Sequence, residues 1–290
     1  MRIEAKDLTF TYSKKSKAIS NRALENVSLC IEEGEFFGII GQTGSGKTTF
    51  VQHLNGLIRV QKDSGSLSVG EFDLTAKKCD LKALRSRVGM VFQYPEYQLF
   101  AETVKDDVAF GLRNFKKELS LEEEERRVKL AIETVGLNYE EIKDKSPFEL
   151  SGGQKRRVAI AGVIVTEPEV LVLDEPVAGL DPVGKRDFMK LLHRLHASFV
   201  KTIILVTHDM NVVSENCTRC AIFSHGKIHS VGSPKEIFSN YEQLIELGLD
   251  IPVTAYLERE LKKFGIDLDS DLTESDFADK TAKAIVGGKQ

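Results

Sequence analysis

A glycine-rich segment near the start of the chain has the residues needed to bind a phosphate group. Residues 41–48 read Gly-Gln-Thr-Gly-Ser-Gly-Lys-Thr, which matches the P-loop pattern in full. Glycine lets the backbone approach a phosphate closely, and the N–H groups of the loop and of the following helix can surround it. Lys47 is expected to reach the β- and γ-phosphates, and the Thr48 hydroxyl to coordinate Mg²⁺. The predicted nucleotide-binding set in this segment is Gly41, Gln42, Thr43, Gly44, Ser45, Gly46, Lys47, Thr48 and Thr49.

Two adjacent carboxylates follow an apolar run at 170–173 and could act on the bound nucleotide. Parallel α/β sheets bind ligands at the carboxyl ends of their strands, which is where such residues would lie. Asp174 is expected to hold Mg²⁺, directly or through water, and Glu175 to polarise an attacking water. A strand that simply ends in a charged turn is the alternative, and the presence of a P-loop disfavours it.

A second anion-binding surface is predicted at residues 151–154, which read Ser-Gly-Gly-Gln and precede a predicted helix. Serine is a preferred first residue of a helix, and the free N–H groups at that end attract anions. We therefore expect this segment to contact a phosphate as well.

The apolar pattern predicts the elements that position these residues. Strands are expected at 2–12, 24–31 and 36–40, a helix at 47–57, and short antiparallel strands within 63–73. Helices follow at 103–115, 120–135 and 151–166. Strands and helices then alternate at 170–173, 183–197, 202–206, 210–216 and 219–224. Such alternation indicates a parallel sheet covered on both faces, so the helical middle is expected to be an insertion in an α/β core.

The chain becomes helical again beyond residue 232. Pro234 and Pro252 stand at expected helix starts. Residues 270–290 are acidic and then end in glycine and lysine, so we expect them to fray.

The Ser-Gly-Gly-Gln segment resembles the signature of ATP-binding cassette (ABC) ATPases, and further cassette motifs stand in the same order along residues 1–232. Gln93 resembles the Q-loop glutamine, Asp181 the aspartate of the D-loop and His208 the switch histidine. Tyr12 resembles the aromatic residue that stacks on adenine, although it could also be a core residue beside Phe10.

The resemblance implies an α/β fold: a P-loop ABC ATPase core with an antiparallel β subdomain, an inserted α-helical subdomain and a C-terminal helical extension. The expected boundaries are 1–232 for the ATPase domain, about 94–166 for the helical insert, and 233–290 for an extension that dimerises. It implies ATP and Mg²⁺ as cofactors. The implied catalytic residues are Glu175, His208, Gln93 and Lys47, and the implied Mg²⁺ ligands are Thr48, Gln93 and Asp174.

In the resembled family two cassettes pair head to tail, with each ATP between one P-loop and the other chain's signature. Ser151, Gly152, Gly153 and Gln154 would then contact the ATP that the partner's P-loop holds, and Asp181 would act across the interface. Val177 departs from the pattern, which usually has Thr or Ser there.

A narrower resemblance is to the ATPase subunits of energy-coupling factor (ECF) transporters, and it reaches to about residue 266. It is carried by residues 94–104, 107–111, 146–149, 154–162 and 232–265. It implies uptake of a vitamin or other micronutrient through a transmembrane coupling protein and a membrane substrate-binding subunit, with a second ABC ATPase subunit, paralogous or identical. The chain would be a peripheral protein on the cytoplasmic face of the cell membrane. Cobalt and nickel uptake ATPases are closely related to this group, and a function of that type stays open as the alternative.

Composition argues against other classes. The 290 residues carry 40 basic and 44 acidic side chains, a formal charge of −4, so no nucleic-acid partner is expected. A chromosome-maintenance ABC protein would need a long coiled-coil insert between Lys47 and Ser151, and the translation type usually has two cassettes. A small-molecule kinase would lack the signature and His208. These non-transport interpretations rank below a transport ATPase.

Two weaker signals remain. Cys217 and Cys220 have the spacing of a metal or redox pair, but without a second pair we expect buried, apolar residues. An aromatic and apolar cluster near Gln93 could belong to the core, but its position beside Gln93 favours a partly exposed groove for a helix of the membrane partner. Its members are Phe92, Tyr94, Tyr97, Leu99, Phe100 and Phe110.

Overall fold

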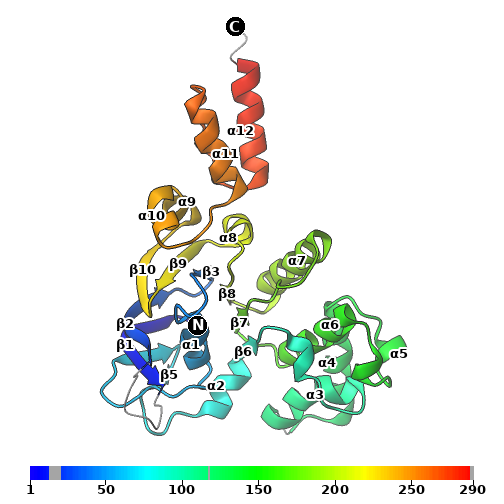
Figure 1. The fold of residues 1–290 in the computed structure, drawn as a ribbon. Helices are drawn as coiled ribbons and strands as arrows, with labels where there is room; N and C mark the ends of the chain where they lie inside the picture. The colour runs from blue at the N-terminus through cyan, green and yellow to red at the C-terminus, as the bar shows by residue number, and fades with distance from the viewer. Residues whose placement is uncertain (13–20, 117, 288–290) are drawn as a thin grey trace.

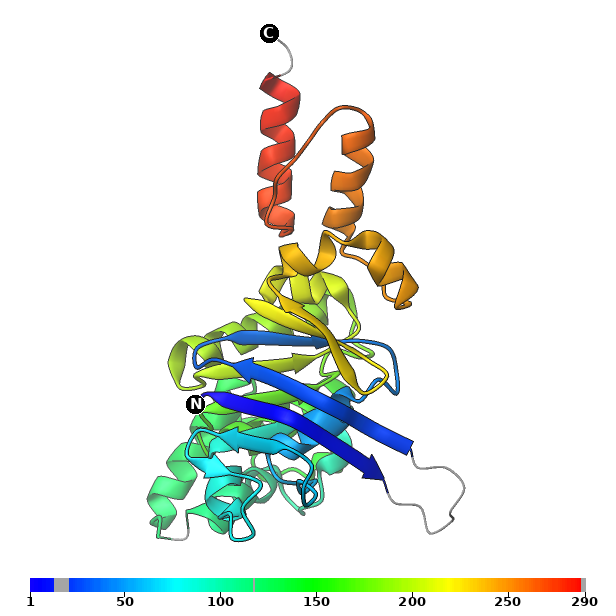
Figure 2. The same cartoon turned by 90° about the vertical axis from the view of Figure 1, so that its left-hand side faces the viewer.

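The computed structural model describes residues 1–12, 21–116 and 118–287, and these residues form two sheets with helices around them (Figure 1). The antiparallel sheet has the strand order β2-β1-β4-β5 and faces the viewer in Figure 2. Its strands are β1 (Ile3–Tyr12), β2 (Asn21–Ile31), β4 (Ser66–Val69) and β5 (Phe72–Asp73). The predicted short strands within 63–73 are thus confirmed.

The second sheet has six strands in the order β10-β9-β3-β8-β7-β6. Five of them are parallel, and only β10 runs antiparallel to its neighbour. They are β3 (Phe36–Ile40), β6 (Val88–Val91), β7 (Val170–Asp174), β8 (Thr202–Val206), β9 (Arg219–Ser224) and β10 (Lys227–Gly232). The predicted parallel sheet is therefore confirmed.

Alternate residues of the parallel strands face two separate apolar cores, as the two-residue period of a strand requires. Phe37 and Ile39 of β3 face a core shared with α1 (Lys47–Leu54) and the antiparallel sheet. Phe36 and Ile40 face the other core, beneath α7 (Pro182–Ser198) and α8 (Met210–Asn216). Burial on both sides explains why these strands read as continuous apolar runs.

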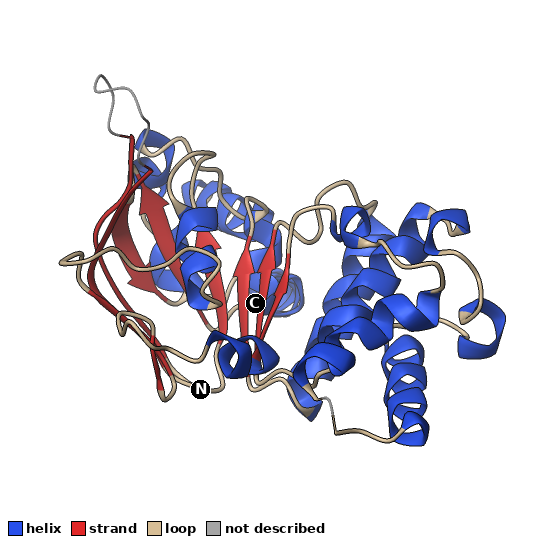
Figure 3. Cartoon of the chain, turned by 90° about the horizontal axis from the view of Figure 1, so that it is seen from below, coloured by secondary structure: helices blue, strands red, loops and turns tan. Residues whose placement is uncertain are grey.

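Four helices form a group beside the sheets, clearly separated in the view from below (Figure 3). They are α3 (Val104–Phe115), α4 (Leu121–Thr134), α5 (Tyr139–Ile142) and α6 (Gly152–Ile164). Each begins after a residue whose side chain accepts a backbone N–H of the first turn, namely Thr103, Ser120, Asn138 and Ser151. The caps of α3, α4 and α6 stand where the sequence predicts these helices to begin.

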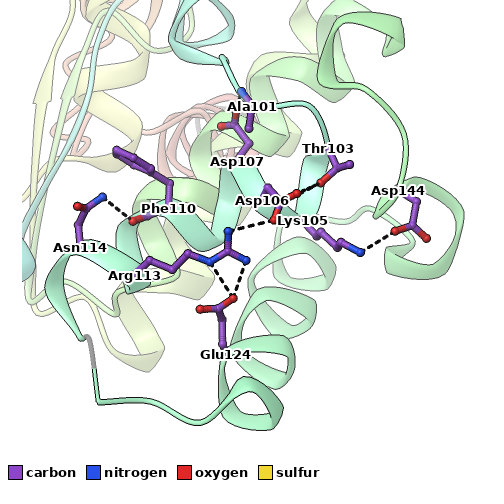
Figure 4. Close-up of polar contacts among 10 residues, drawn as sticks. All are labelled: Ala101, Thr103, Lys105, Asp106, Asp107, Phe110, Arg113, Asn114, Glu124 and Asp144. Atoms are coloured by element: carbon purple, nitrogen blue, oxygen red, sulfur yellow. Dashed lines mark hydrogen bonds and ion pairs between the residues drawn. The ribbon is translucent and has the colours of Figure 1, made fainter.

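Polar contacts join these helices to each other (Figure 4). Arg113 of α3 lies 3.0 Å from Asp106 and 2.8 Å from Glu124 of α4. Lys105 lies 2.9 Å from Asp144, in the segment after α5. The buried Asp107 carboxylate accepts the backbone N–H groups of Phe100 and Ala101 at 2.8 and 2.9 Å. The segment before α3 is therefore tied to the helix that follows it.

The C-terminal part contains α9 (Pro234–Phe238), α10 (Tyr241–Glu246), α11 (Val253–Lys263) and α12 (Glu274–Gly287). The last two project beyond the sheets (Figures 1 and 2). The expected fraying of 270–290 is wrong for the helical part, because the Thr254 hydroxyl donates to the Leu272 carbonyl at 2.7 Å and Ser270 is buried. Residues 288–290 lie outside the described residues.

Some elements are absent from the sequence prediction: α2 (Leu81–Arg87), α5, β6 and β10. Gly89 interrupts the apolar run of β6, and a side chain there would lie 2.7 Å from Val163. None of the helices in the described ranges combines the length and apolarity that a membrane span needs.

Candidate nucleotide-binding site

A cavity of about 500 Å³ lies where β3, β7 and β8 end. Residues from widely separated parts of the chain line it: Tyr12, Arg22, Ala23, Thr43, Gly44, Ser45, Gly46, Lys47, Thr48, Thr49, Gln93, Asp174, Glu175 and His208. The cavity thus brings together the P-loop with Asp174, Glu175, Gln93 and His208, as the sequence predicts. Gly41 and Gln42 belong to the same loop but lie outside the lining.

The backbone of the P-loop depends on glycine. Gly41 has a φ of +149°, and a side chain there would lie 2.2 Å from the Phe223 carbonyl oxygen. Gly46, which precedes the first residue of α1, has a φ of +104° and would meet the Ala23 carbonyl at 2.5 Å. Only glycine fits both the dihedral angles and the space, so the loop can wrap closely beneath the cavity.

Lys47 is folded over the P-loop. Its Nζ donates to the carbonyl oxygens of Gly41 at 2.6 Å and of Gln42 at 2.8 Å. Burial lowers the pKa of Lys47, although the nearby carboxylates of Glu175 and Asp174 oppose the shift. A buried ammonium beside a cavity attracts an anion, because the anion would offset the cost of burying the charge.

Two carboxylates stand at the end of β7. Asp174 is buried, and burial raises its pKa against the opposing effects of a hydrogen bond from Thr48 and the charge of Lys47. Glu175 turns away from the strand in the left-handed region, with a φ of +50°, while its N–H donates to the Val206 carbonyl at 2.9 Å. The turn directs two consecutive carboxylates to different places in the cavity.

Glu175 and His208 form a pair across adjacent strands. Glu175 Oε2 lies 2.9 Å from His208 Nδ1. Asp174 pairs with Val206 in the parallel register of β7 and β8, so the residues just beyond both strand ends are neighbours. The pairing follows directly from the sheet topology.

Tyr12 and Gln93 complete the lining. Tyr12 ends β1 with 44% of its surface exposed, and its hydroxyl lies 3.3 Å from Thr49 Oγ1. Gln93 follows β6 by two residues. The alternative of Tyr12 as a core residue is disfavoured by this exposure.

The signature segment lies apart from the cavity of its own chain. Ser151, Gly152 and Gly153 are exposed at the start of α6, and the Ser151 and Gln154 side chains cap this helix reciprocally. Asp181 caps α7, accepting the Gly184 N–H at 2.6 Å. Neither segment lines the cavity.

Sequence reasoning missed three residues that bear on the site. Arg22 and Ala23 of β2 line the cavity, with no motif to identify them. Arg156 of α6 is buried and donates to the carbonyls of Pro176 and Ala178 at 3.4 and 3.1 Å, so it joins the signature helix to the segment before Asp181. The only signal for Arg156 in the sequence is a basic residue on a helix face that is otherwise apolar.

Burial decides the role of the Cys217–Cys220 pair. Both are free and buried, and burial raises the pKa of Cys220 to about 12 and that of Cys217 well above its usual value. Such thiols are unreactive, in keeping with the predicted apolar role. Among the described residues, no group of three or more His, Cys, Asp or Glu side chains could hold a metal ion.

The predicted aromatic groove is present in part. A second cavity of about 460 Å³ is lined by Phe92, Leu99, Phe100 and Phe110 of the predicted cluster. Phe100 is more than half exposed and Phe110 is about half exposed. Their rings pack edge to face, with centroids 4.8 Å apart. Tyr94 and Tyr97 lie outside this lining.

A family model, curated relatives and solved structures all indicate the same family for this chain. Residues 24–178 match the family model of the ABC transporter. The energy-coupling factor transporter ATP-binding protein EcfA2 of Clostridioides difficile (strain 630) is 46% identical over 100% of this chain and 99% of its own length. The EcfA2 of Clostridium perfringens (strain 13 / Type A) is 47% identical over 94% of each chain.

Solved structures show the same fold. The structure of cbiO1 from Clostridium perfringens, part of the ABC transporter complex cbiONQ, has a TM-score of 0.71 and 37% identity, and the match covers 89% of this chain and 98% of that one. The ATP-binding cassette MJ0796, a dimer in a post-hydrolysis state bound to ADP and Pi, has a TM-score of 0.70 and 31% identity over 79% of this chain and 97% of that one. The predicted fold class is confirmed, and the chain belongs to the ABC transporter family, among the ATP-binding subunits of energy-coupling factor transporters.

Proposed function

We propose that this chain hydrolyses ATP to power uptake of a vitamin or other micronutrient through separate membrane subunits. The observation that carries the proposal is the cavity itself, which combines a P-loop with Asp174, Glu175, Gln93 and His208. The kinship with ECF ATP-binding subunits supports transport as the purpose of the hydrolysis.

The P-loop would hold the triphosphate. Its backbone N–H groups and the start of α1 would surround the β-phosphate, and Lys47 would leave the carbonyls of Gly41 and Gln42 to contact the β- and γ-phosphates. Tyr12, exposed at the rim, would stack on the adenine base.

The donor set fits Mg²⁺. This ion prefers oxygen ligands and is usually held by one or two carboxylates together with substrate phosphates. The Thr48 hydroxyl and the Asp174 carboxylate supply such oxygens on the phosphate side of the cavity, and Gln93 adds an amide oxygen. Bound there, the ion would neutralise charge on the phosphates.

Glu175 and His208 would act on the attacking water. Glu175 would accept its proton while His208, 2.9 Å away, keeps the carboxylate in place and contacts the γ-phosphate. Gln93 would sense the presence of the γ-phosphate. Catalysis of this kind rests on positioning and charge stabilisation rather than on a covalent intermediate.

The second half of the ATP site would come from another cassette. Ser151, Gly152 and Gly153 are exposed and lie outside the cavity of their own chain, so their free N–H groups can meet a partner's γ-phosphate. Gln154 and Asp181 would lie at the same interface. The dimeric arrangement of MJ0796 supports such a pairing.

We further propose the division of the chain into residues 1–232 as the ATPase domain, with the insert at about 94–166, and residues 233–290 as an extension that dimerises. Exposed apolar residues on α11 and α12 support the second part: Val253, Tyr256, Leu257, Ile285 and Val286. The partner cassette would be paralogous or identical, and no nucleic acid would be needed.

The groove beside Phe100 and Phe110 would receive a helix of the transmembrane coupling protein, which would hold the chain peripherally on the cytoplasmic face of the membrane. A substrate-binding membrane subunit would select the cargo. Amphipathic helices commonly dock their apolar face in such grooves, and aromatic residues are typical of interface centres.

Purification from detergent-solubilised membranes tests this proposal. Tagged full-length chain should carry a second cassette and integral membrane proteins, and mass spectrometry should find an organic micronutrient in the complex; bound cobalt or nickel would favour the alternative cargo. Phe100→Glu should release the membrane proteins, whereas Leu121→Glu, also at an exposed apolar position but on α4, should retain them. Isolation of the chain free of membrane proteins and with nucleic acid attached would contradict the proposal.

A further inference from the structure

A histidine with no role in phosphate chemistry lies beneath the rim of the nucleotide cavity. His53, on α1, is fully buried and is not part of the cavity lining. Its Nδ1 lies 2.7 Å from the Thr49 carbonyl oxygen, and its Nε2 has no hydrogen-bond partner in the described part of the chain. Burial lowers the pKa of His53 and thus favours the neutral ring.

The Phe10 ring connects His53 to Tyr12. The His53 and Phe10 rings meet edge to face with centroids 4.9 Å apart, and Phe10 meets Tyr12 edge to face at 4.8 Å with perpendicular planes. Phe10 is buried, while Tyr12 is the exposed end of the series. Both contacts have the geometry that aromatic pairs prefer.

Thr49 closes the arrangement from the other side. Its carbonyl oxygen contacts His53 Nδ1, and its hydroxyl lies 3.3 Å from the Tyr12 hydroxyl. Thr49 belongs to the P-loop helix and is itself buried. The Tyr12 ring therefore packs against Phe10 and its hydroxyl contacts Thr49, and His53 contacts both of these residues.

An exposed aromatic side chain at the end of a strand would otherwise sample several rotamers. Stacking on a base would then require the ring to be ordered on binding, which weakens affinity. We propose that His53 and Phe10 are positioning residues that hold the Tyr12 ring in the orientation that receives the adenine base. This inference rests on the proposed role of Tyr12 in base stacking.

Two ligands separate base binding from phosphate binding: ATP, and inorganic tripolyphosphate, which has no base. Binding of each to the full-length chain is measured by calorimetry with Mg²⁺. His53→Leu and Phe10→Leu should weaken ATP binding about threefold to tenfold, the size expected for loss of one edge-to-face contact, and leave tripolyphosphate binding unchanged. In steady-state hydrolysis the same loss should fall on KM rather than on kcat.

Two further variants test whether His53 positions the Tyr12 ring or only fills space in the core. His53→Phe keeps a ring against Phe10 and should restore ATP binding to within about twofold of the original chain. In a Tyr12→Ala background, His53→Leu should have no further effect on ATP binding, because the ring that it positions is absent.

The outcomes separate the inference from the proposed function. If Tyr12→Ala leaves the ratio of ATP to tripolyphosphate affinity unchanged, base stacking by Tyr12 is wrong. If Tyr12→Ala changes that ratio but His53→Leu does not, or if His53→Leu weakens both ligands equally, positioning by His53 is wrong. Retained tripolyphosphate binding shows that the P-loop of each variant is folded.

Discussion

At the scale of single residues, Lys47 and Asp174 are two ionisable groups whose charged forms the protein disfavours. Burial is the main cause for both, lowering the pKa of Lys47 and raising that of Asp174. Their mutual attraction opposes these shifts without cancelling them. A triphosphate with Mg²⁺ would stabilise both charged forms, so the site is electrostatically prepared for that ligand.

Asp174→Asn is therefore expected to stabilise the nucleotide-free chain at neutral pH. An acid whose pKa is raised on folding carries an unfavourable charge above that pKa, and the cost disappears below the unfolded value of 3.8. We expect the melting temperature at pH 7 to rise by about 2–4 °C, with the gain shrinking as the pH falls toward 3.8. Mg²⁺-dependent ATP binding should be lost in the same variant.

Thermal unfolding between about pH 4 and 7 measures the effect, and Asp187→Asn, at an exposed position on α7, is the control. A lower melting temperature for Asp174→Asn at every pH would show that Asp174 stabilises the nucleotide-free chain, contrary to this account.

At the scale of elements, a single buried carboxylate shapes the groove beside Phe100. Asp107 of α3 accepts two backbone N–H groups from the preceding segment, whereas Asp144 pairs with Lys105 in solvent (Figure 4). The first arrangement satisfies otherwise unpaired donors, and the second is an exposed ion pair of little worth.

Asp107→Ala should lower the free energy of unfolding by about 1–3 kcal/mol, because the N–H groups of Phe100 and Ala101 lose their acceptor. Asp144→Ala should cost less than about 1 kcal/mol. Urea titration of both variants gives the comparison. Equal losses in the two would mean that Asp107 does not order the segment.

Whether a strand can be predicted from the sequence depends on how its residues are buried. The strands at Thr202–Val206 and Arg219–Ser224 are located correctly because burial on both faces makes them largely apolar. The edge strand β10 is missed because its exposure alternates, and Lys227 and His229 dilute its apolar pattern. Strand β6 is missed because Gly89 interrupts its apolar run. Glycine is needed at this position because a side chain would lie too close to Val163.

The cavity residues divide similarly. Lys47, Glu175 and His208 stand in motifs with fixed spacing, so the amino-acid sequence is enough to locate them. Arg22, which lines the cavity, and His53, which lies outside its lining, have no such signal, because their places depend on β2 and α1 packing near β1. Contacts between distant segments carry no local pattern, and only the folded chain reveals them.

At the scale of the whole molecule, the proposed function makes this chain one half of an ATP-hydrolysing unit. The P-loop cavity contains the groups that we propose hold phosphate and activate water, while the signature segment is exposed elsewhere on the same chain. The groove and the apolar faces of α11 and α12 offer further surfaces for partners. Function is therefore expected only in an assembly, in which this chain supplies one catalytic carboxylate.

Glu175 is proposed to activate the water that hydrolyses ATP in a membrane transport complex. The most direct measurement compares the ATPase rate of the complex purified from membranes with that of the same complex carrying Glu175→Gln, with Glu246→Gln on α10 as the control. Glutamine cannot accept the proton of the attacking water, so turnover should fall at least twofold, the loss of one of two sites, while subunit composition and ATP binding stay unchanged. Undiminished hydrolysis by the Glu175→Gln complex would contradict the account.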